Sequence, residues 1–238
     1  MSDLRTFPRL EAVRAVTIDA AGTLLRPYPS VGATYAEVLR KHGASADGVE
    51  IEKRFRRAFA EVRSNQVSFI GEEQFFWREV VRLSVEGLCP EEELDAVFTE
   101  LWELYATGEA WKPAEGAAET LGVLRERGLR LALLSNNDSR VGNVLDDLGL
   151  SSCFDDLLLS SELGLEKPDA AIFRKAEEVL AVDPSEALHL GDSLKADVEG
   201  ALFAGWRAAW FSPNGKAQEP PLGVPVLSSF CELQTLLA

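Results

Sequence analysis

Four polar residues whose side chains can take part in catalysis each end or follow a short apolar run. Asp19 ends the run AVTID, Ser135 ends RLALLS, and Asp192 ends ALHLGD. Lys167 lies in LEKPD, in the loop after a fourth run, DLLLS (156–160). Carboxylates are ligands suited to Mg²⁺, lysine is a compact cation for an anionic group, and an aspartate can attack phosphorus as a nucleophile. These residue types, placed where strands end, therefore point to a catalytic site.

The runs that carry these residues predict buried strands, and the stretches between them predict helices. Strands are expected at 15–19, 130–135, 156–160, 187–192 and 207–211, and helices at about 115–127, 139–149, 169–181 and 194–205. Such alternation is typical of parallel β-α units, whose buried strands read as continuous apolar runs. The expected fold class is α/β, with a doubly wound parallel sheet. Ligands bind such sheets beyond the carboxyl ends of the strands, which is where the four polar residues fall.

Residues 28–110 have helical periodicity throughout. Phe55, Ala58, Phe59 and Val62 recur at the spacing of one helix face. This pattern predicts an all-helical insertion between the first and second strands of the α/β core. The expected domains are a core of residues 1–27 and 111–238 and a cap of residues 28–110.

Composition and charge disfavour several classes of partner. The chain has 238 residues, 46% of them hydrophobic, and a net charge of −15. A negative net charge disfavours nucleic acids and anionic membranes, because both are bound through basic patches. No stretch approaches the roughly 20 apolar residues of a membrane span, and the start of the chain has no apolar signal-peptide core. The three cysteines are widely spaced and form no Cys-x-x-Cys pattern, so the cytoplasm is the expected compartment.

Four motifs in chain order resemble those of the haloacid dehalogenase superfamily, subfamily IA. They are DAAGTLL (19–25), LLSNND (133–138), LEKPDAAIF (165–173) and LHLGDSLKAD (188–197). The cap stretches FRRAFAEVRSN and FFWREVV further resemble the branch named for rhythmically expressed gene product 2. The resemblance covers nearly the whole chain. It implies a Rossmann-like core, an inserted helical cap and a Mg²⁺-dependent hydrolase.

The resemblance also implies a role for the residues of the first motif. Asp19 would be the nucleophile that forms an aspartyl phosphate. Mg²⁺ would bind Asp19, Asp192 and the backbone carbonyl of Ala21. Gly22 would permit the tight turn after the strand, and Thr23 would support it.

The remaining motifs would hold the phosphate. Ser135 and the amide of Asn136 would bind phosphate oxygens, and Lys167 would neutralise their charge. Asp197 would support either the metal shell or Lys167. His189 lies inside an apolar strand and is interpreted as a core residue whose polar atoms are satisfied, not as a catalyst.

Ala21 departs from the pattern of the phosphatases in this superfamily, which have an aspartate there. That aspartate protonates the leaving group and then activates water, and a general acid–base group contributes typically ~10²–10⁴-fold. We favour a slow or specialised phosphohydrolase that acts on a small phosphorylated molecule. One alternative is a phosphonoacetaldehyde hydrolase, which also has Ala here and uses a cap lysine, for which Lys41 and Lys53 are the candidates. Another is a retired member that binds a phosphorylated ligand or a protein. A dehalogenase fits worst, because that branch has Tyr at this position and lacks an acidic metal ligand such as Asp192.

Overall fold

Backbone contacts divide the computed structural model into two units. The core unit consists of Met1–Leu25, Pro113–Asn137 and Gly149–Ala238, and the helical unit of Arg26–Lys112 and Asp138–Leu148. The structure describes residues 10, 12–65, 70–213, 215 and 219–238. The expectation about a signal peptide concerns the start of the chain, which lies almost wholly outside these residues. The chain crosses between the units within β2 (Leu25–Pro27) and β3 (Trp111–Pro113), which pair with each other, and again at each end of segment 138–148.

The core unit contains a six-stranded parallel sheet with the order β5-β4-β1-β6-β7-β8. The strands are β1 (Ala15–Ile18), β4 (Arg130–Ser135), β5 (Asp156–Leu159), β6 (Ala187–Gly191), β7 (Arg207–Phe211) and β8 (Val226–Leu227). Every residue of β1 and β6 is buried, as the apolar runs predicted. The predicted α/β class with a doubly wound parallel sheet is confirmed, and β8 is a strand that the sequence did not predict.

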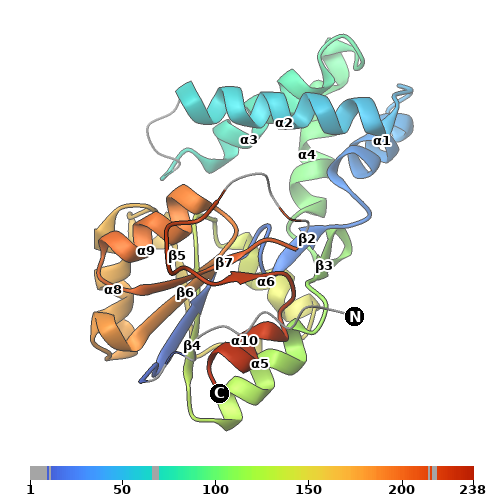
Figure 1. The fold of residues 1–238 in the computed structure, drawn as a ribbon. Coiled ribbons are helices and arrows are strands. Elements are labelled where there is room, and N and C mark those ends of the chain that lie inside the picture. The colour runs from blue at the N-terminus through green and yellow to red at the C-terminus, as the bar shows by residue number, and fades with distance from the viewer. Residues whose placement is uncertain (1–9, 11, 66–69, 214, 216–218) are drawn as a thin grey trace. The chain divides into compact units, whose positions relative to one another are not determined.

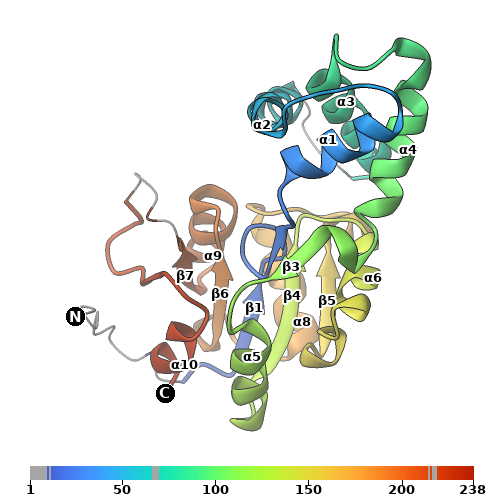
Figure 2. The same ribbon diagram turned by 90° about the vertical axis from the view of Figure 1, so that its right-hand side faces the viewer.

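Helices cover both faces of this sheet (Figures 1 and 2). On one face lie α8 (Ala170–Leu180) and α9 (Gly200–Phe203), which pack on the strands through side chains such as Ile172, Phe173 and Ala201. On the other lie α5 (Ala117–Glu126) and α10 (Glu232–Leu236), which contact each other. The shorter helical segments of the unit are η3 (Ser151–Cys153), α7 (Ser160–Leu163) and η4 (Pro184–Glu186).

The helix expected at 194–205 has a different form in the structure. A π-helical segment, η5 (Leu194–Glu199), precedes the single α-helical turn of α9. The carbonyl of Ser193 accepts hydrogen bonds from the amides of both Asp197 (3.0 Å) and Val198 (3.2 Å). This shared acceptor widens the first turn, a feature that often occurs at functional sites.

The helical unit packs its helices around apolar and aromatic side chains. Its elements are α1 (Val31–Lys41), α2 (Gly48–Asn65), α3 (Glu73–Val85), η1 (Glu91–Glu93), α4 (Leu94–Leu104), η2 (Gly108–Ala110) and α6 (Arg140–Asp147). Phe59 of α2 meets the buried Phe76 of α3 edge to face, with ring centroids 5.7 Å apart. None of the described helices, in either unit, is long and apolar enough to cross a membrane.

Segment 138–148, which contains α6, belongs to the helical unit, although the predicted domain boundaries assign it to the core. The guanidinium of Arg140 lies 3.3 Å from the ring centroid of Trp102 and donates to the Trp102 carbonyl at 3.1 Å. It also forms two 2.8 Å hydrogen bonds with Asp138. These contacts join α6 to α4, and no periodicity in the sequence indicates them.

Strand register brings three of the predicted site residues to one edge of the sheet. Ile18 is aligned with Leu133 of β4 and with Leu190 of β6. Asp19 follows Ile18 directly, and its amide donates to the Leu190 carbonyl at 2.9 Å. Ser135 and Asp192 each lie two residues beyond the aligned leucines, so all three side chains reach the carboxyl edge of the sheet.

Candidate active site

Asp19 is held at the end of β1 by two donors from other parts of the chain. The hydroxyl of Ser135 donates to Oδ1 of Asp19 at 2.9 Å, and Nζ of Lys167 donates to the same oxygen at 2.8 Å. The residue is 8% exposed. A buried carboxylate with two donors on one oxygen has a fixed orientation, which a nucleophile requires.

The ammonium group of Lys167 is buried and has three close acceptors. They are Oδ1 of Asp19 at 2.8 Å, Oδ1 of Asp197 at 2.6 Å and the carbonyl of Leu134 at 2.8 Å. Burial by itself would lower the pKa of Lys167, but the charges of Asp19 and Asp197 outweigh burial and raise that pKa above its ordinary value. Lys167 is therefore a fixed cation beside the carboxylate of Asp19.

The side chain of Asn136 holds the backbone of Lys167 in place. Its Oδ1 accepts from the Lys167 amide and its Nδ2 donates to the Lys167 carbonyl, both at 2.8 Å. The neighbouring Asn137 donates through Nδ2 to the Ser135 hydroxyl at 3.3 Å. The sequence suggested only a backbone role for Asn136. The Asn136 side chain joins the second motif to the third. Two successive asparagines in the stretch SNND gave no sign of this role.

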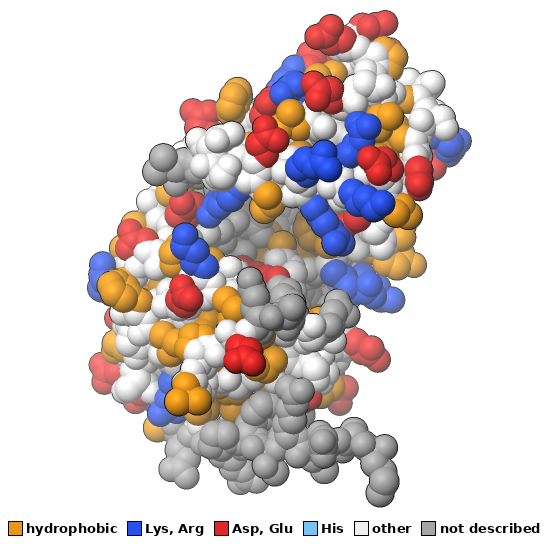
Figure 3. All heavy atoms as spheres, turned by 45° about the horizontal axis from the view of Figure 1, so that its top comes forward, with side chains coloured by type: hydrophobic (Ala, Val, Ile, Leu, Met, Phe, Trp, Pro, Cys, Tyr) orange, Lys and Arg blue, Asp and Glu red, His pale blue; other side chains and the backbone are white. Residues whose placement is uncertain are grey.

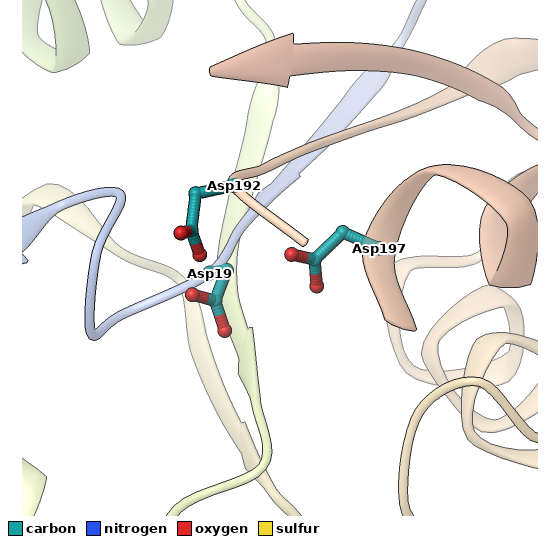
Figure 4. Close-up of side chains that lie close together, drawn as sticks. All are labelled: Asp19, Asp192 and Asp197. Atoms are coloured by element: carbon teal, nitrogen blue, oxygen red, sulfur yellow. The ribbon is translucent and has the colours of Figure 1, made fainter. Parts of the chain in front are cut away.

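Three carboxylates converge at this edge of the sheet. Asp19, Asp192 and Asp197 each offer an oxygen within 4.8 Å of the others, and Figure 4 shows their side chains turned toward a common region. The two oxygens of Asp197 are engaged, one by Lys167 and the other by the amide of Ser193 at 2.8 Å. Asp19 and Asp192 are therefore the pair that suits a divalent ion, and Asp197 supports Lys167.

The charge balance of this cluster fits Mg²⁺. Burial raises the pKa of Asp19 to about 6, although Lys167 opposes the shift. For Asp197 burial acts in the same direction, but Lys167 outweighs it and holds the pKa below its usual range. One ammonium thus faces three carboxylates, and ionised they leave an excess of two negative charges. A divalent cation with oxygen ligands would neutralise that excess, so the residues present fit the ion.

The turn after Asp19 is built closely against Asp192. Gly22 has φ of +98°, and a Cβ at this position would lie 2.9 Å from the Asp192 carboxyl carbon. Gly22 is therefore required both for the backbone conformation and for the approach of Asp192. Ala21 is exposed on this turn. The Thr23 hydroxyl is buried, with no hydrogen-bond partner among the residues that the structure describes.

The two lysines considered for imine chemistry lie in the helical unit. Lys41 forms a 2.6 Å ion pair with Glu100, which raises the pKa of Lys41 above its ordinary value. This pairing disfavours Lys41 as an imine-forming amine, because the amine must be unprotonated to attack a carbonyl. Lys53 lines a pocket of about 470 Å³ within the helical unit, together with Ser30, Gly48 and other residues of the same unit.

Comparison with known proteins gives consistent matches over most of the chain. Residues 13–205 match the family described as haloacid dehalogenase-like hydrolase. Haloacid dehalogenase-like hydrolase domain-containing protein 3 of Mus musculus is 34% identical over 200 residues, which cover 81% of this chain and 79% of the mouse protein. Rhythmically expressed gene 2 protein of Drosophila melanogaster is 31% identical over 216 residues, covering 84% of this chain and 83% of that relative. The cap stretches indicated the same branch.

Solved structures with the same fold include both a phosphatase and a dehalogenase. A HAD phosphatase from Thermococcus onnurineus has a TM-score of 0.67 at 26% identity, covering 94% of this chain and 97% of its own. A 2-haloacid dehalogenase from Pseudomonas syringae pv. tomato has a TM-score of 0.66 at 25% identity with the same coverage. Fold similarity alone does not distinguish phosphatase from dehalogenase chemistry. The residues of the site have to make that distinction.

Proposed function

The chain belongs to the haloacid dehalogenase-like hydrolase family, and we propose that it is a Mg²⁺-dependent phosphohydrolase of the cytoplasm. It acts on a small phosphorylated molecule through an aspartyl phosphate on Asp19. One observation carries the proposal. The carboxylate of Asp19 is held by Lys167 and Ser135 beside a second carboxylate, that of Asp192.

The chemistry follows from what these side chains can do. An oxygen of Asp19 forms a bond to phosphorus while the bond from phosphorus to the leaving group breaks. Lys167 offsets the negative charge of the phosphoryl group, and the Ser135 hydroxyl donates at the same place. Mg²⁺, when bound by Asp19 and Asp192, would supply further charge neutralisation. Water then attacks the aspartyl phosphate, releasing inorganic phosphate and restoring Asp19.

Ala21 restricts which substrates this site converts quickly. The methyl group has no proton to give to the leaving group and cannot activate the attacking water. Substrates whose leaving group needs little protonation, such as acyl phosphates, are therefore favoured over alkyl phosphomonoesters. The second half of the reaction is slow with any substrate, because water attacks without a base from this position.

Two neighbouring chemistries are less well supported. A dehalogenase of this superfamily lacks the acidic ligand that Asp192 provides, and the buried charge excess around Asp19 suits a cation. A phosphonoacetaldehyde hydrolase needs an unprotonated cap lysine, and the ion pair of Lys41 with Glu100 disfavours that role. Borohydride added with phosphonoacetaldehyde is expected to leave no adduct on Lys41 or Lys53.

The test is an activity screen of the purified protein with Mg²⁺ against acyl phosphates, phosphomonoesters and phosphonoacetaldehyde. Wild type should act on acyl phosphates first, and Asp19→Asn should be inactive on all. Ala21→Asp should raise phosphomonoester hydrolysis by up to ~10²-fold, the lower end of a general acid–base contribution. The exposed position of Ala21 leaves room for the new side chain. A folded, Mg²⁺-bound Ala21→Asp variant no faster than wild type on any phosphomonoester contradicts the proposal.

A further inference from the structure

His189 is a fully buried histidine directly behind Lys167. It lies in the middle of β6, and the edge-to-face contact with Phe173, with centroids 5.6 Å apart, holds its ring. Nδ1 lies 2.8 Å from the Thr17 hydroxyl on β1. Nε2 lies 3.2 Å from Oδ1 of Asp197 and 3.4 Å from Nζ of Lys167. As expected, its polar atoms have partners, but two of those partners belong to the active-site network.

Counting protons decides which nitrogen of His189 carries hydrogen. The ammonium of Lys167 has three hydrogens and three acceptors at 2.6–2.8 Å, so none remains for His189 at 3.4 Å. Asp197 can only accept when ionised, which requires Nε2 to be the donor to it. In the neutral ring Nδ1 is then an acceptor and takes the hydroxyl hydrogen of Thr17.

A neutral donor suits this location. Burial, with the adjacent charge of Lys167, lowers the pKa of His189 to about 4. A second cation here would compete with Lys167 for Asp197, whereas a neutral Nε2–H orients Asp197 and leaves its charge for Lys167. The resulting chain of hydrogen bonds runs from Thr17 through His189, Asp197 and Lys167 to Asp19.

We propose that His189 is a positioning residue, fixed by Thr17 as the neutral Nε2–H tautomer, that holds Asp197 against Lys167 and so keeps Lys167 on the nucleophile. Its effect on turnover rests on the proposed function, but the tautomer and its effect on Lys167 do not. Thr17→Val removes the hydroxyl that selects the tautomer, and Thr17→Ser keeps it. His189→Gln keeps a donor that can reach Asp197, and His189→Leu removes it.

The test uses nitrogen NMR, because the chain has only two histidines. In ¹⁵N-histidine-labelled His42→Gln protein at neutral pH, His189 should show a protonated Nε2 and an unprotonated Nδ1. Thr17→Ser should preserve this spectrum, and Thr17→Val should give a mixture of tautomers. In ¹⁵N-lysine-labelled protein, the buried ammonium of Lys167, assigned by its loss in Lys167→Met, should shift in His189→Leu and less in His189→Gln.

Kinetics provides the second measurement, with an acyl phosphate as the probe. Thr17→Val should lower kcat by about 3- to 10-fold with little change in KM, the effect of losing one hydrogen bond behind the reacting groups. Thr17→Ser should restore the rate. Should wild type hydrolyse no phosphate compound, the proposed function fails and the two NMR spectra still decide the present inference.

Three results would overturn the inference. One is a protonated or Nδ1–H ring for His189 in the wild-type fold. Another is an unchanged Lys167 signal in a folded His189→Leu variant. The third is wild-type kcat in a Thr17→Val protein whose tautomer has changed. Because His189→Leu alone risks misfolding, the Thr17 pair, which leaves the ring in place, keeps the inference falsifiable.

Discussion

The core unit and the helical unit use charge in opposite ways. In the core, Lys167 and Asp197 form an ion pair in which both side chains are at most 3% exposed. In the helical unit, most of the described ion pairs are open to solvent, as in Arg40–Glu37, whose side chains are 69% and 52% exposed. Figure 3 shows acidic and basic side chains interspersed on the surface. Buried charges in the core organise a site, whereas the exposed charges of the helical unit mostly keep the outer faces of its helices in contact with water.

Buried and exposed ion pairs differ in whether water can replace the partner. A buried ion is tolerable only when its partners are in place, so the Lys167 network fixes several residues at once. An exposed ion pair has water as an alternative partner, and most such pairs contribute little. Order in the helical unit comes instead from apolar contacts, such as that between Phe59 and Phe76.

Removing one lysine from each unit should give the largest contrast. Lys167→Met leaves two carboxylates without their buried cation, which should cost about 3–5 kcal/mol of unfolding free energy. Lys41→Met breaks an exposed pair with Glu100 and should leave the unfolding free energy nearly unchanged. Urea unfolding curves of both variants test this difference, and equal losses in the two proteins would remove the distinction between the units.

A pair of glycine variants should show a smaller, more specific contrast. Gly22 and Gly43 both have positive φ, so the backbone strain of an alanine should cost each about 1–2 kcal/mol of stability. A Cβ on Gly22 meets the Asp192 carboxylate, whereas a Cβ on Gly43 has no atom within 4 Å. Mg²⁺ should therefore raise the melting temperature of Gly43→Ala as in wild type, and that of Gly22→Ala less. An equal Mg²⁺-induced rise in the melting temperature of both variants would contradict the assignment of Asp192 as a metal ligand.

The two histidines should give pH dependences of opposite sign. Hydrogen bonds to Glu93 and Glu100 raise the pKa of His42 above 6.5. The stability that His42 contributes is present below pH 6.5 and is lost as pH rises through the raised pKa. His189 has its pKa lowered to about 4, so the unfolded state binds more protons between pH 4 and 6.5. Its contribution to stability therefore falls as pH decreases through that range.

Unfolding free energies measured against pH in wild type, His42→Gln and His189→Gln would reveal both slopes. The difference in unfolding free energy between wild type and His42→Gln should shrink toward high pH. The difference between wild type and His189→Gln should shrink toward low pH. Slopes of the same sign would contradict the assignment of His42 as a histidine whose charged form is paired with glutamates and of His189 as a buried neutral ring.

The sequence predicted the fold of the core because its strands are continuous apolar runs, and three of the candidate site residues end or follow such runs. Apolar runs located the strands, and parallel register then brings Asp19, Ser135 and Asp192 to one edge. The sequence left open whether Asp197 serves the metal or Lys167, because five residues of spacing fit both. The π-helical turn at 194–199 and the hydrogen bond from the Ser193 amide to Asp197 hold the Asp197 carboxylate next to Lys167. No periodicity in the sequence indicates that turn.

Other features depend on contacts between segments far apart in the chain. The Asn136 side chain reaches the Lys167 backbone, 31 residues away. Arg140 joins α6 to Trp102, 38 residues away, and so to the helical unit. His189 reads as an ordinary core residue in an apolar run, and only its distances to Asp197 and Thr17 reveal its place in the network. Such long-range polar contacts leave no local pattern in one sequence.

The most direct test of the central claim is to trap the phosphoryl group on Asp19. Wild-type protein with Mg²⁺ is mixed with acetyl phosphate, quenched in acid and digested for mass spectrometry. Because no side chain at position 21 activates water, the peptide that contains Asp19 should carry a phosphoryl group in a large fraction of molecules. Asp19→Asn should carry none, and Ala21→Asp should carry less, because its new carboxylate speeds hydrolysis. Mg²⁺-bound wild type with no phosphoryl group on Asp19, or with equal labelling in Asp19→Asn, would contradict the account.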